Sequence, residues 1–222
     1  MRTDFFCKKV QVLRIFSLFV LILMALLLYS RIKKAPALNY SASFYFIVSE
    51  ELNIEASTEL IKFGGGAGYL IQKGAREYVA LNVYLDKIEA ENVCERLTSA
   101  GNKVEILVFE KSITSMAGMA KNTQKYYAGG LSSLKSCISV LSQTINLLDK
   151  GLSQERACAI LQDLARQLSY LANEYTQYEK FSLACNNFSR RIRLECQEVL
   201  YAAKLRFILC DCAVGYLQLL EK

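Results

Sequence analysis

Eight cysteines and no histidine define the chemistry available to this chain of 222 residues. Histidine is the commonest general base and the commonest metal ligand, so its absence argues against a hydrolytic or zinc enzyme. The cysteines stand at positions 7, 94, 137, 158, 185, 196, 210 and 212, without a CxxC pair. Because cysteine often fills protein cores as a small apolar residue, we expect buried free thiols, with disulfides or redox roles as the alternative. We predict no catalytic residue, no metal site and no cofactor.

Two further features bear on nucleotide or nucleic-acid binding. The glycine run from Gly64 to Gly68 lacks the Gly-Lys-Ser/Thr that follows a phosphate-binding loop, so we interpret it as a helix-to-strand connection. Residues 41–110 carry six Lys/Arg against eleven Asp/Glu. Neutralising phosphates requires clustered basic side chains, so we expect no nucleic-acid partner.

Residues 1–40 contain an uncharged apolar run, residues 15–29, between basic flanks. Extended back to Val10, the run is long enough for a single-pass transmembrane helix, with the N-terminus inside and the bulk of the chain outside the cytoplasm. A cleaved signal peptide with a site at residues 35–37 is one alternative, and a buried soluble helix is another. Arg31, Lys33 and Lys34 precede that site and disfavour processing, so we predict a retained membrane anchor.

Residues 43–110 alternate between strand and helix patterns. Strands are expected at 44–49, 69–72, 78–84 and 104–109, and amphipathic helices at 53–63 and 86–100. Asp86 suits the N-cap of the second helix, and Gly101 suits its left-handed C-terminal stop. The order β-α-β-β-α-β predicts a ferredoxin-like α+β domain whose helices cover one sheet face and leave the other open.

This region resembles the sporulation-related repeat, or SPOR domain, of bacterial envelope proteins. The resemblance rests on the strand Tyr78-Val79-Ala80-Leu81-Asn82, the aromatic Tyr84, and Ala90, Cys94, Leu97 and Gly101 at fixed spacing behind it. It implies binding of peptidoglycan glycan strands stripped of their stem peptides, through the open sheet face.

Strand alternation predicts which side chains would carry that binding. Val79 and Leu81 are expected to face the helices, so Tyr78, Ala80 and Asn82 face outward. On the first strand, either Phe44 and Phe46 or Tyr45 and Ile47 face outward. The resemblance therefore implies a glycan-binding set of Tyr78, Ala80, Asn82 and Phe46.

Residues 111–125 are expected to form a linker, and residues 126–222 an all-α three-helix bundle. Apolar residues alternate steps of three and four along residues 131–148 and again along 157–178, which is typical of helix packing seams. Asn186-Asn187 is interpreted as a break before a third helix, from Phe188 to Leu220. That helix is apolar on more than one side, so it is either the central element of the bundle or a surface for a partner.

The leading hypothesis is a membrane-anchored peptidoglycan-binding protein of the bacterial cell membrane, acting in targeting or scaffolding at sites of cell division or sporulation. The alternative is a non-enzymatic interaction module that assembles a membrane-associated complex without affinity for glycan. In both cases the bundle, residues 126–222, is expected to bind a protein partner or a second copy of the chain.

Overall fold

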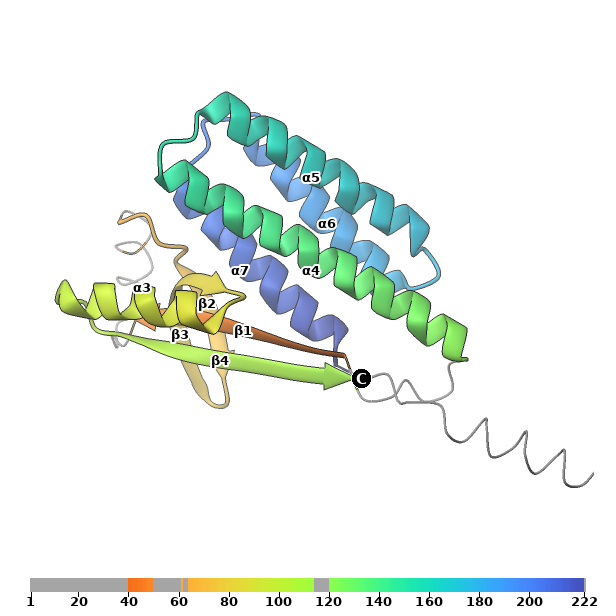
Figure 1. The fold of residues 1–222 in the computed structure, drawn as a ribbon, viewed down its shortest axis with the longest axis horizontal. Helices are drawn as coiled ribbons and strands as arrows, with labels where there is room; N and C mark the ends of the chain where they lie inside the picture. Colours follow the sequence, from red (N-terminus) through yellow and green to blue (C-terminus); the bar gives the residue numbers. More distant parts are fainter. Residues whose placement is uncertain (1–39, 50–60, 62–63, 114–119, 222) are drawn as a thin grey trace, which may run out of the picture. The chain divides into compact units, whose positions relative to one another are not determined.

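A four-stranded antiparallel sheet forms one layer of the computed structural model (Figure 1). Its strands are β1 (Tyr40–Ser49), β2 (Tyr69–Lys73), β3 (Arg76–Tyr84) and β4 (Val104–Ile113), in the spatial order β2-β3-β1-β4. The structure describes residues 40–49, 61, 64–113 and 120–221. The strand order is the one expected of a ferredoxin-like sheet. The predicted first helix, residues 53–63, lies outside the described residues apart from Ile61.

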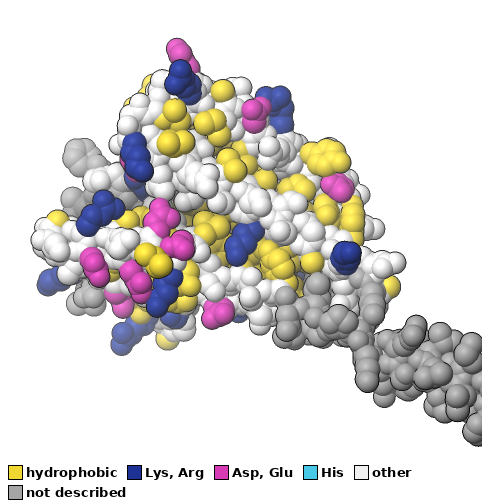
Figure 2. Space-filling model, in the orientation of Figure 1, with side chains coloured by type: hydrophobic (Ala, Val, Ile, Leu, Met, Phe, Trp, Pro, Cys, Tyr) yellow, Lys and Arg dark blue, Asp and Glu magenta, His cyan; other side chains and the backbone are white. Residues whose placement is uncertain are grey.

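Helix α3 (Lys87–Ser99) begins and ends at the residues that the sequence predicts. The carboxylate of Asp86 accepts a hydrogen bond from the backbone N–H of Glu89 at 2.8 Å, which satisfies an otherwise unpaired donor in the first turn. Gly101 follows the helix with a φ of +89°, a conformation that glycine adopts without a Cβ clash. The outer surface of α3 is charged, as Figure 2 shows, and Lys87 pairs with Glu91 at 3.2 Å.

The glycine run lies between Ile61, which is helical, and strand β2. The N–H of Gly66 donates to the carbonyl oxygen of Ile61 at 2.7 Å, and Gly65 has a φ of +89°. This hydrogen bond spans five residues around a left-handed glycine, as it does at many helix C-termini. The prediction of a helix-to-strand connection is confirmed.

Four helices, rather than three, form the bundle, so the predicted fold class is wrong on this point. They are α4 (Lys121–Asp149), α5 (Gln154–Glu174), α6 (Glu179–Glu195) and α7 (Ala202–Leu219) (Figure 1). The predicted break at Asn186-Asn187 falls inside α6, where both side chains are exposed and do not interrupt the backbone. The predicted third helix is instead divided at residues 196–201, into α6 and α7.

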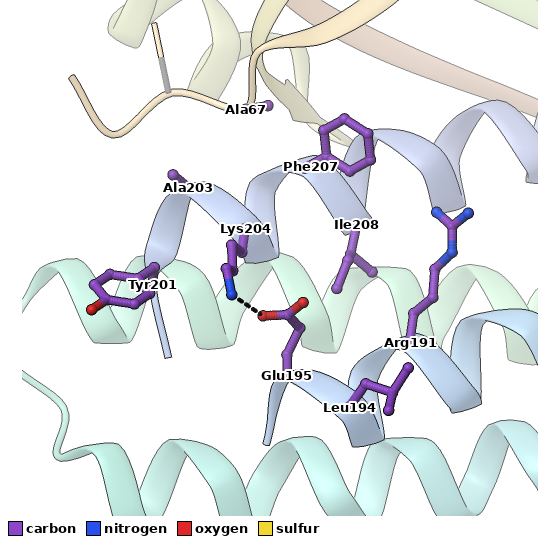
Figure 3. A pocket seen from close by; sticks show the side chains of 9 residues that line it. All are labelled: Ala67, Arg191, Leu194, Glu195, Tyr201, Ala203, Lys204, Phe207 and Ile208. Carbon is purple, nitrogen blue, oxygen red and sulfur yellow. Dashed lines mark ion pairs between the residues drawn. The ribbon is translucent and has the colours of Figure 1, made fainter. Parts of the chain in front are cut away.

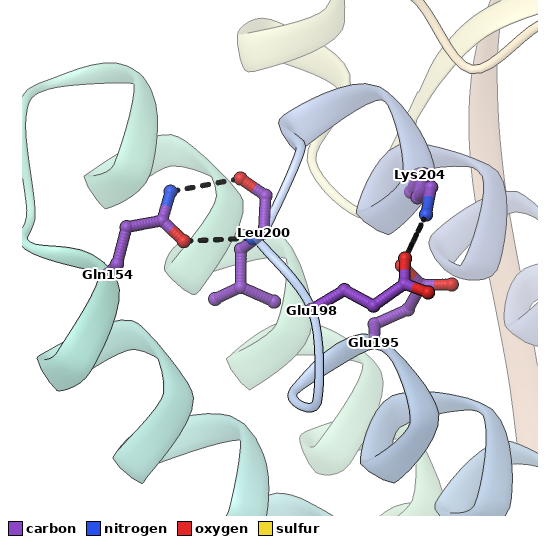
Figure 4. Close-up of polar contacts among 5 residues, drawn as sticks. All are labelled: Gln154, Glu195, Glu198, Leu200 and Lys204. Carbon is purple, nitrogen blue, oxygen red and sulfur yellow. Dashed lines mark hydrogen bonds and ion pairs between the residues drawn. The ribbon is translucent and has the colours of Figure 1, made fainter.

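The turn between α6 and α7 contains neither glycine nor proline, which is why the sequence pattern missed it. It is held by Gln154 of α5, whose amide pairs with both backbone groups of Leu200 (Figure 4). Leu200 N–H donates to Gln154 Oε1 at 2.8 Å, and Gln154 Nε2 donates to Leu200 O at 3.0 Å. Leu200 itself is buried. A long-range contact therefore holds the turn that separates α6 from α7.

The predicted transmembrane helix was placed on the apolar run, extended back to Val10. Among the helices of the described residues, none combines the length and the apolar character needed to cross a bilayer. The apolar run of residues 15–29 lies outside the described residues.

Helix α7 lies between the sheet and the other helices (Figure 1). It is buried on several sides, with Leu205, Leu209, Ala213 and Tyr216 fully enclosed. A helix that is apolar all round belongs in a core. The core residues of the bundle and those of one sheet face form one continuous cluster, so the segments expected as separate domains share a core within the unit Leu38–Lys222.

Candidate functional site

The sheet face that was expected to bind glycan is covered by α7. Phe44 on β1 contacts Tyr216 on α7, edge to face, with ring centroids 5.7 Å apart. Tyr69 on β2 makes the same kind of contact with Phe207 at 5.0 Å. A fully buried side chain of this size contributes about 1.5–3 kcal/mol of hydrophobic stabilisation. The face is therefore an internal interface of the fold.

The four predicted glycan-binding residues do not share one exposed face. Phe46 and Ala80 each have 0% exposed surface, and Tyr78 is half-buried against the shared core. Asn82 is 8% exposed and lies on the opposite face, which α3 covers, because its β1 partner is Ile47. The prediction of an open face carrying all four side chains is wrong.

An irregularity in the strand pairing explains the position of Asn82. Ile47 pairs with Asn82 while the next residue, Val48, pairs with Ala80, so Leu81 is an extra residue on β3. A bulge of this kind reverses the inward and outward alternation beyond it. Tyr78 and Ala80 therefore face α7, whereas Asn82 and Tyr84 face α3.

Polar contacts tie the covered face to α7 at both ends of the helix. Near its C-terminal end, the hydroxyls of Tyr40 and Tyr216 are hydrogen-bonded to each other. At its N-terminal end, Arg206 donates to the carbonyl oxygen of Gly65 and pairs with Asp149 of α4. These contacts join the sheet, α7 and α4 into one structure.

An apolar hollow lies where α6 ends and α7 begins (Figure 3). We call it the α6–α7 pocket. Its volume is about 730 Å³, and its apolar walls are formed by Ala67, Leu194, Tyr201, Ala203, Phe207 and Ile208. Ligand pockets in proteins commonly measure roughly 300–1,000 Å³ and are mostly apolar with a few polar groups. The pocket is therefore the best candidate site in the described part of the chain.

Three charged side chains also line the α6–α7 pocket, and both cations already have partners. Lys204 Nζ lies 2.8 Å from Glu198 Oε2 and 3.6 Å from Glu195 Oε2. Its hydrogen bond to Glu198 raises the pKa of Lys204, and the same bond lowers the pKa of the Glu198 carboxyl. Arg191 Nη1 lies 2.6 Å from Asp211 Oδ2. Because both cations are already paired with carboxylates, neither is free to bind an anionic ligand.

Glu195 differs from the other charged groups of the pocket. Its Oε2 atom is buried and accepts no hydrogen bond from the described residues, and its ion-pair distance to Lys204 exceeds hydrogen-bond range. The pocket therefore offers a hydrogen-bond acceptor beside apolar walls, which suits a ligand that carries an N–H or O–H donor.

The cysteines of the described residues form no metal-binding group. All seven that lie in the described residues are free thiols, and no group of three or more Cys, Asp or Glu there could hold a metal ion. Burial raises the pKa of Cys137 to about 11 and that of Cys185 to about 12. Because the thiolate is the reactive form, these thiols are unreactive at neutral pH.

Several pocket residues were not singled out from the sequence. Glu195, Tyr201 and Lys204 lie at the α6–α7 turn, which the sequence pattern did not reveal. One sequence feature did indicate this region: the predicted third helix is apolar on several sides. Leu194, Phe207 and Ile208 of the pocket belong to that predicted helix. Two arginines of α6 near the pocket already have partners, since Arg191 pairs with Asp211 and Arg193 donates to Ser169 Oγ at 3.0 Å.

No protein-family model, no curated protein and no solved structure compared with the chain matches it. The resemblance of residues 43–110 to SPOR domains therefore stays a prediction from the residue pattern.

Proposed function

We propose that this protein is a non-enzymatic interaction module whose α6–α7 pocket binds a short apolar segment of a partner protein. The segment would place an apolar side chain between Leu194, Phe207 and Ile208. It would also present a lysine or arginine to Glu195. The observation that carries the proposal is the buried Oε2 atom of Glu195, which accepts no hydrogen bond from the described residues and lies 3.6 Å from Lys204 Nζ, in the wall of a large apolar pocket.

The surroundings of the pocket favour a peptide segment over a small molecule. Leu194 and Tyr201 are 53% and 57% exposed, and Val199, in the adjoining turn, is 60% exposed. Large apolar side chains left in water at the edge of a pocket are typical of protein interaction sites. A small molecule inside the pocket would leave these edges uncovered, whereas a peptide would extend across them.

Glycan binding through the sheet, the function expected from the resemblance, is supported less well by the geometry. Stacking on a sugar ring requires an exposed face, and Phe46 and Ala80 have no exposed surface. The proposal therefore rests on the alternative hypothesis, an interaction module, and gives it a site.

The test is selection of binding peptides from a random display library with the full-length wild-type chain. We expect enriched peptides that combine apolar anchors with one lysine or arginine. Leu194→Asp should weaken their binding by about tenfold or more, because it places a charge in the apolar wall. Glu195→Gln should reduce the preference for the basic residue while retaining the apolar anchors.

Leu183→Asp is the matched control, since Leu183 is also on α6, is 59% exposed, and does not line the pocket. Peptides whose binding is insensitive to Leu194→Asp, or is equally sensitive to Leu183→Asp, would disprove the assignment of the pocket.

Two other outcomes would indicate a different binding partner. Self-association in light scattering that Leu194→Asp abolishes would make a second copy the occupant. Sedimentation with stripped glycan strands that Tyr78→Ala abolishes would restore the glycan hypothesis.

A further inference from the structure

Helices α5 and α6 approach each other through small residues at matched positions. Ser182 Oγ donates to Ala172 O at 2.7 Å, and Ser189 Oγ donates to Ala165 O at 2.6 Å. A side-chain hydroxyl on Cβ can reach the backbone of the neighbouring helix only where the two backbones lie close together. The two serines are seven residues apart on α6, and the two alanines are seven apart on α5.

The next position in the same register brings two cysteines together. Seven residues beyond Ser189 stands Cys196, and seven residues before Ala165 stands Cys158. Cys158 Sγ donates to Cys196 O at 3.6 Å, and Cys196 Sγ donates to Cys158 O at 4.0 Å. Each thiol thus lies against the backbone of the other residue.

We propose that Cys158 and Cys196 are the site of a reversible disulfide that links the beginning of α5 to the end of α6. A disulfide requires Cα atoms about 4.4–6.8 Å apart, and the reciprocal thiol–backbone contacts place the two cysteines side by side. The bond would hold the last turn of α6, where Glu195 lies, against α5. The proposal does not depend on the function proposed for the α6–α7 pocket.

Access from solvent distinguishes this pair from the buried cysteines. Cys158 and Cys196 are half-buried, and Cys196 lines an open hollow of about 340 Å³ together with Arg166, Arg193 and Gln197. Cys185 and Cys210 are each 0% exposed. Burial and the contact with Cys158 raise the pKa of Cys196 to about 12, so the pair stays reduced at neutral pH until an oxidant acts on it.

The oxidant is a low-molecular-weight disulfide, for which oxidised glutathione is the probe. One cysteine thiolate attacks a glutathione sulfur, forms a mixed disulfide and releases one glutathione thiolate, which takes up a proton. The other cysteine loses its proton to solvent and attacks the protein sulfur of the mixed disulfide, releasing the second glutathione. Two protein S–H bonds and one glutathione S–S bond are thereby exchanged for one protein S–S bond and two glutathione thiols.

The experiment incubates the full-length chain with oxidised glutathione at about pH 8.5, where the thiolate fraction is larger. Tryptic peptides are then mapped by mass spectrometry without reduction. We expect a cross-linked pair, residues 157–166 with residues 194–204, whose mass is about 2 Da below the sum of the two and which dithiothreitol separates. The urea midpoint of the oxidised chain should rise relative to that of the reduced chain.

Cys158→Ala and Cys196→Ser are suitable variants, because alanine on α5 and serine on α6 already occupy the equivalent positions of this interface. In each variant the remaining cysteine should retain glutathione as a mixed disulfide, and the rise in urea midpoint should disappear. The matched control is Cys94→Ala, which removes another half-buried thiol and should leave the cross-link unchanged. A wild-type chain that carries glutathione on both cysteines without a cross-link would overturn the proposal. A cross-link from Cys158 to any other cysteine would do the same.

Discussion

Tyr69, on the edge strand β2, donates a hydrogen bond from its hydroxyl to Asp211 Oδ1 of α7 across 3.3 Å. The other oxygen of the same carboxylate, Oδ2, accepts from Arg191 of α6 at 2.6 Å. One aspartate on the central helix thus connects the sheet to the bundle. Burial and the nearby Asp211 charge both raise the pKa of Tyr69, so its hydroxyl stays protonated and able to donate.

Tyr69→Phe should lower the free energy of unfolding by about 1 kcal/mol, the usual contribution of one hydrogen bond. The ring contact with Phe207 is retained and Asp211 keeps Arg191, so no larger loss is expected. Urea denaturation followed by circular dichroism measures the change. Tyr170→Phe is the control, because Tyr170 is 67% exposed, and it should leave stability unchanged. Equal stabilities for the two variants would show that the link between Tyr69 and Asp211 contributes nothing.

Two adjacent glycines on α4 should respond to alanine in opposite directions. A methyl group at Gly130 would lie 2.6 Å from Cε1 of Tyr175, whereas one at Gly129 would lie 3.6 Å from the Tyr175 hydroxyl. Gly130→Ala should therefore destabilise the protein by about 1–3 kcal/mol through overpacking. Gly129→Ala should stabilise it by up to about 1 kcal/mol, because alanine favours helix.

Tyr175 cannot easily move away from an added methyl group at Gly130. Its ring stacks on Tyr126 with centroids 4.5 Å apart, and its hydroxyl donates to the Tyr126 carbonyl oxygen at 3.1 Å. Thermal unfolding of the two alanine variants provides the comparison. A stable Gly130→Ala variant would mean that the tyrosine cluster around Tyr175 is more adaptable than its contacts indicate.

Phe46→Ala should destabilise the protein by about 3–5 kcal/mol, as truncation of a buried aromatic residue does. Phe46 is 0% exposed and packs edge to face on Phe109, with centroids 5.3 Å apart. Val108→Ala, on neighbouring strand β4, removes a side chain that is 41% exposed and should cost about 0.5 kcal/mol. Chemical denaturation of both variants tests the assignment of Phe46 to the core. Similar small losses in the free energy of unfolding for the two variants would contradict that assignment.

Alkaline pH should destabilise the protein through its buried thiols. Burial raises the pKa of Cys185 from 9.0 to about 12 and that of Cys137 from 9.0 to about 11. Above about pH 9 the unfolded chain loses these protons while the folded chain keeps them, so folding becomes less favourable as pH rises. The contribution of these thiols to the free energy of unfolding is therefore fully present below pH 9 and declines as the pH rises toward 11. Above pH 9, Cys185 alone should lower the free energy of unfolding by about 1.4 kcal/mol per pH unit.

Urea denaturation at a series of pH values, with a reductant present, measures the alkaline decline. In the Cys185→Ala variant the urea midpoint should fall less steeply with pH above 9, because one of the protons that the folded chain retains is removed. A midpoint that stays constant up to pH 10 would indicate that the thiols ionise within the folded chain.

Local features of the fold were predictable from the sequence. Asp86 and Gly101 delimit α3 through interactions with their immediate neighbours. The ends of this helix could therefore be predicted from nearby residues alone. The packing seams of α4 and α5 were equally readable. Leu131, Leu134 and Ile138 are buried, as the helical spacing predicts.

The candidate site depended on contacts that no local pattern records. The α6–α7 turn is held by Gln154, which lies 46 residues before Leu200 and pairs with its backbone. Without that turn, Leu194 and Tyr201 would not face one pocket. The glycan-binding set failed for a similar reason, since the extra residue Leu81 shifts the strand pairing and moves Asn82 to the other face.

The sequence by itself determined that this chain lacks histidine, that strand and helix patterns alternate within residues 43–110, and that the last predicted helix is apolar on several sides. Only the tertiary structure decided that this helix, α7, covers the sheet face expected to be open. Composition and spacing specify how much apolar surface a helix carries, and along which faces. Which other surface it buries depends on the free energy of the whole assembly, to which residues as distant in sequence as Phe44 and Tyr216 contribute.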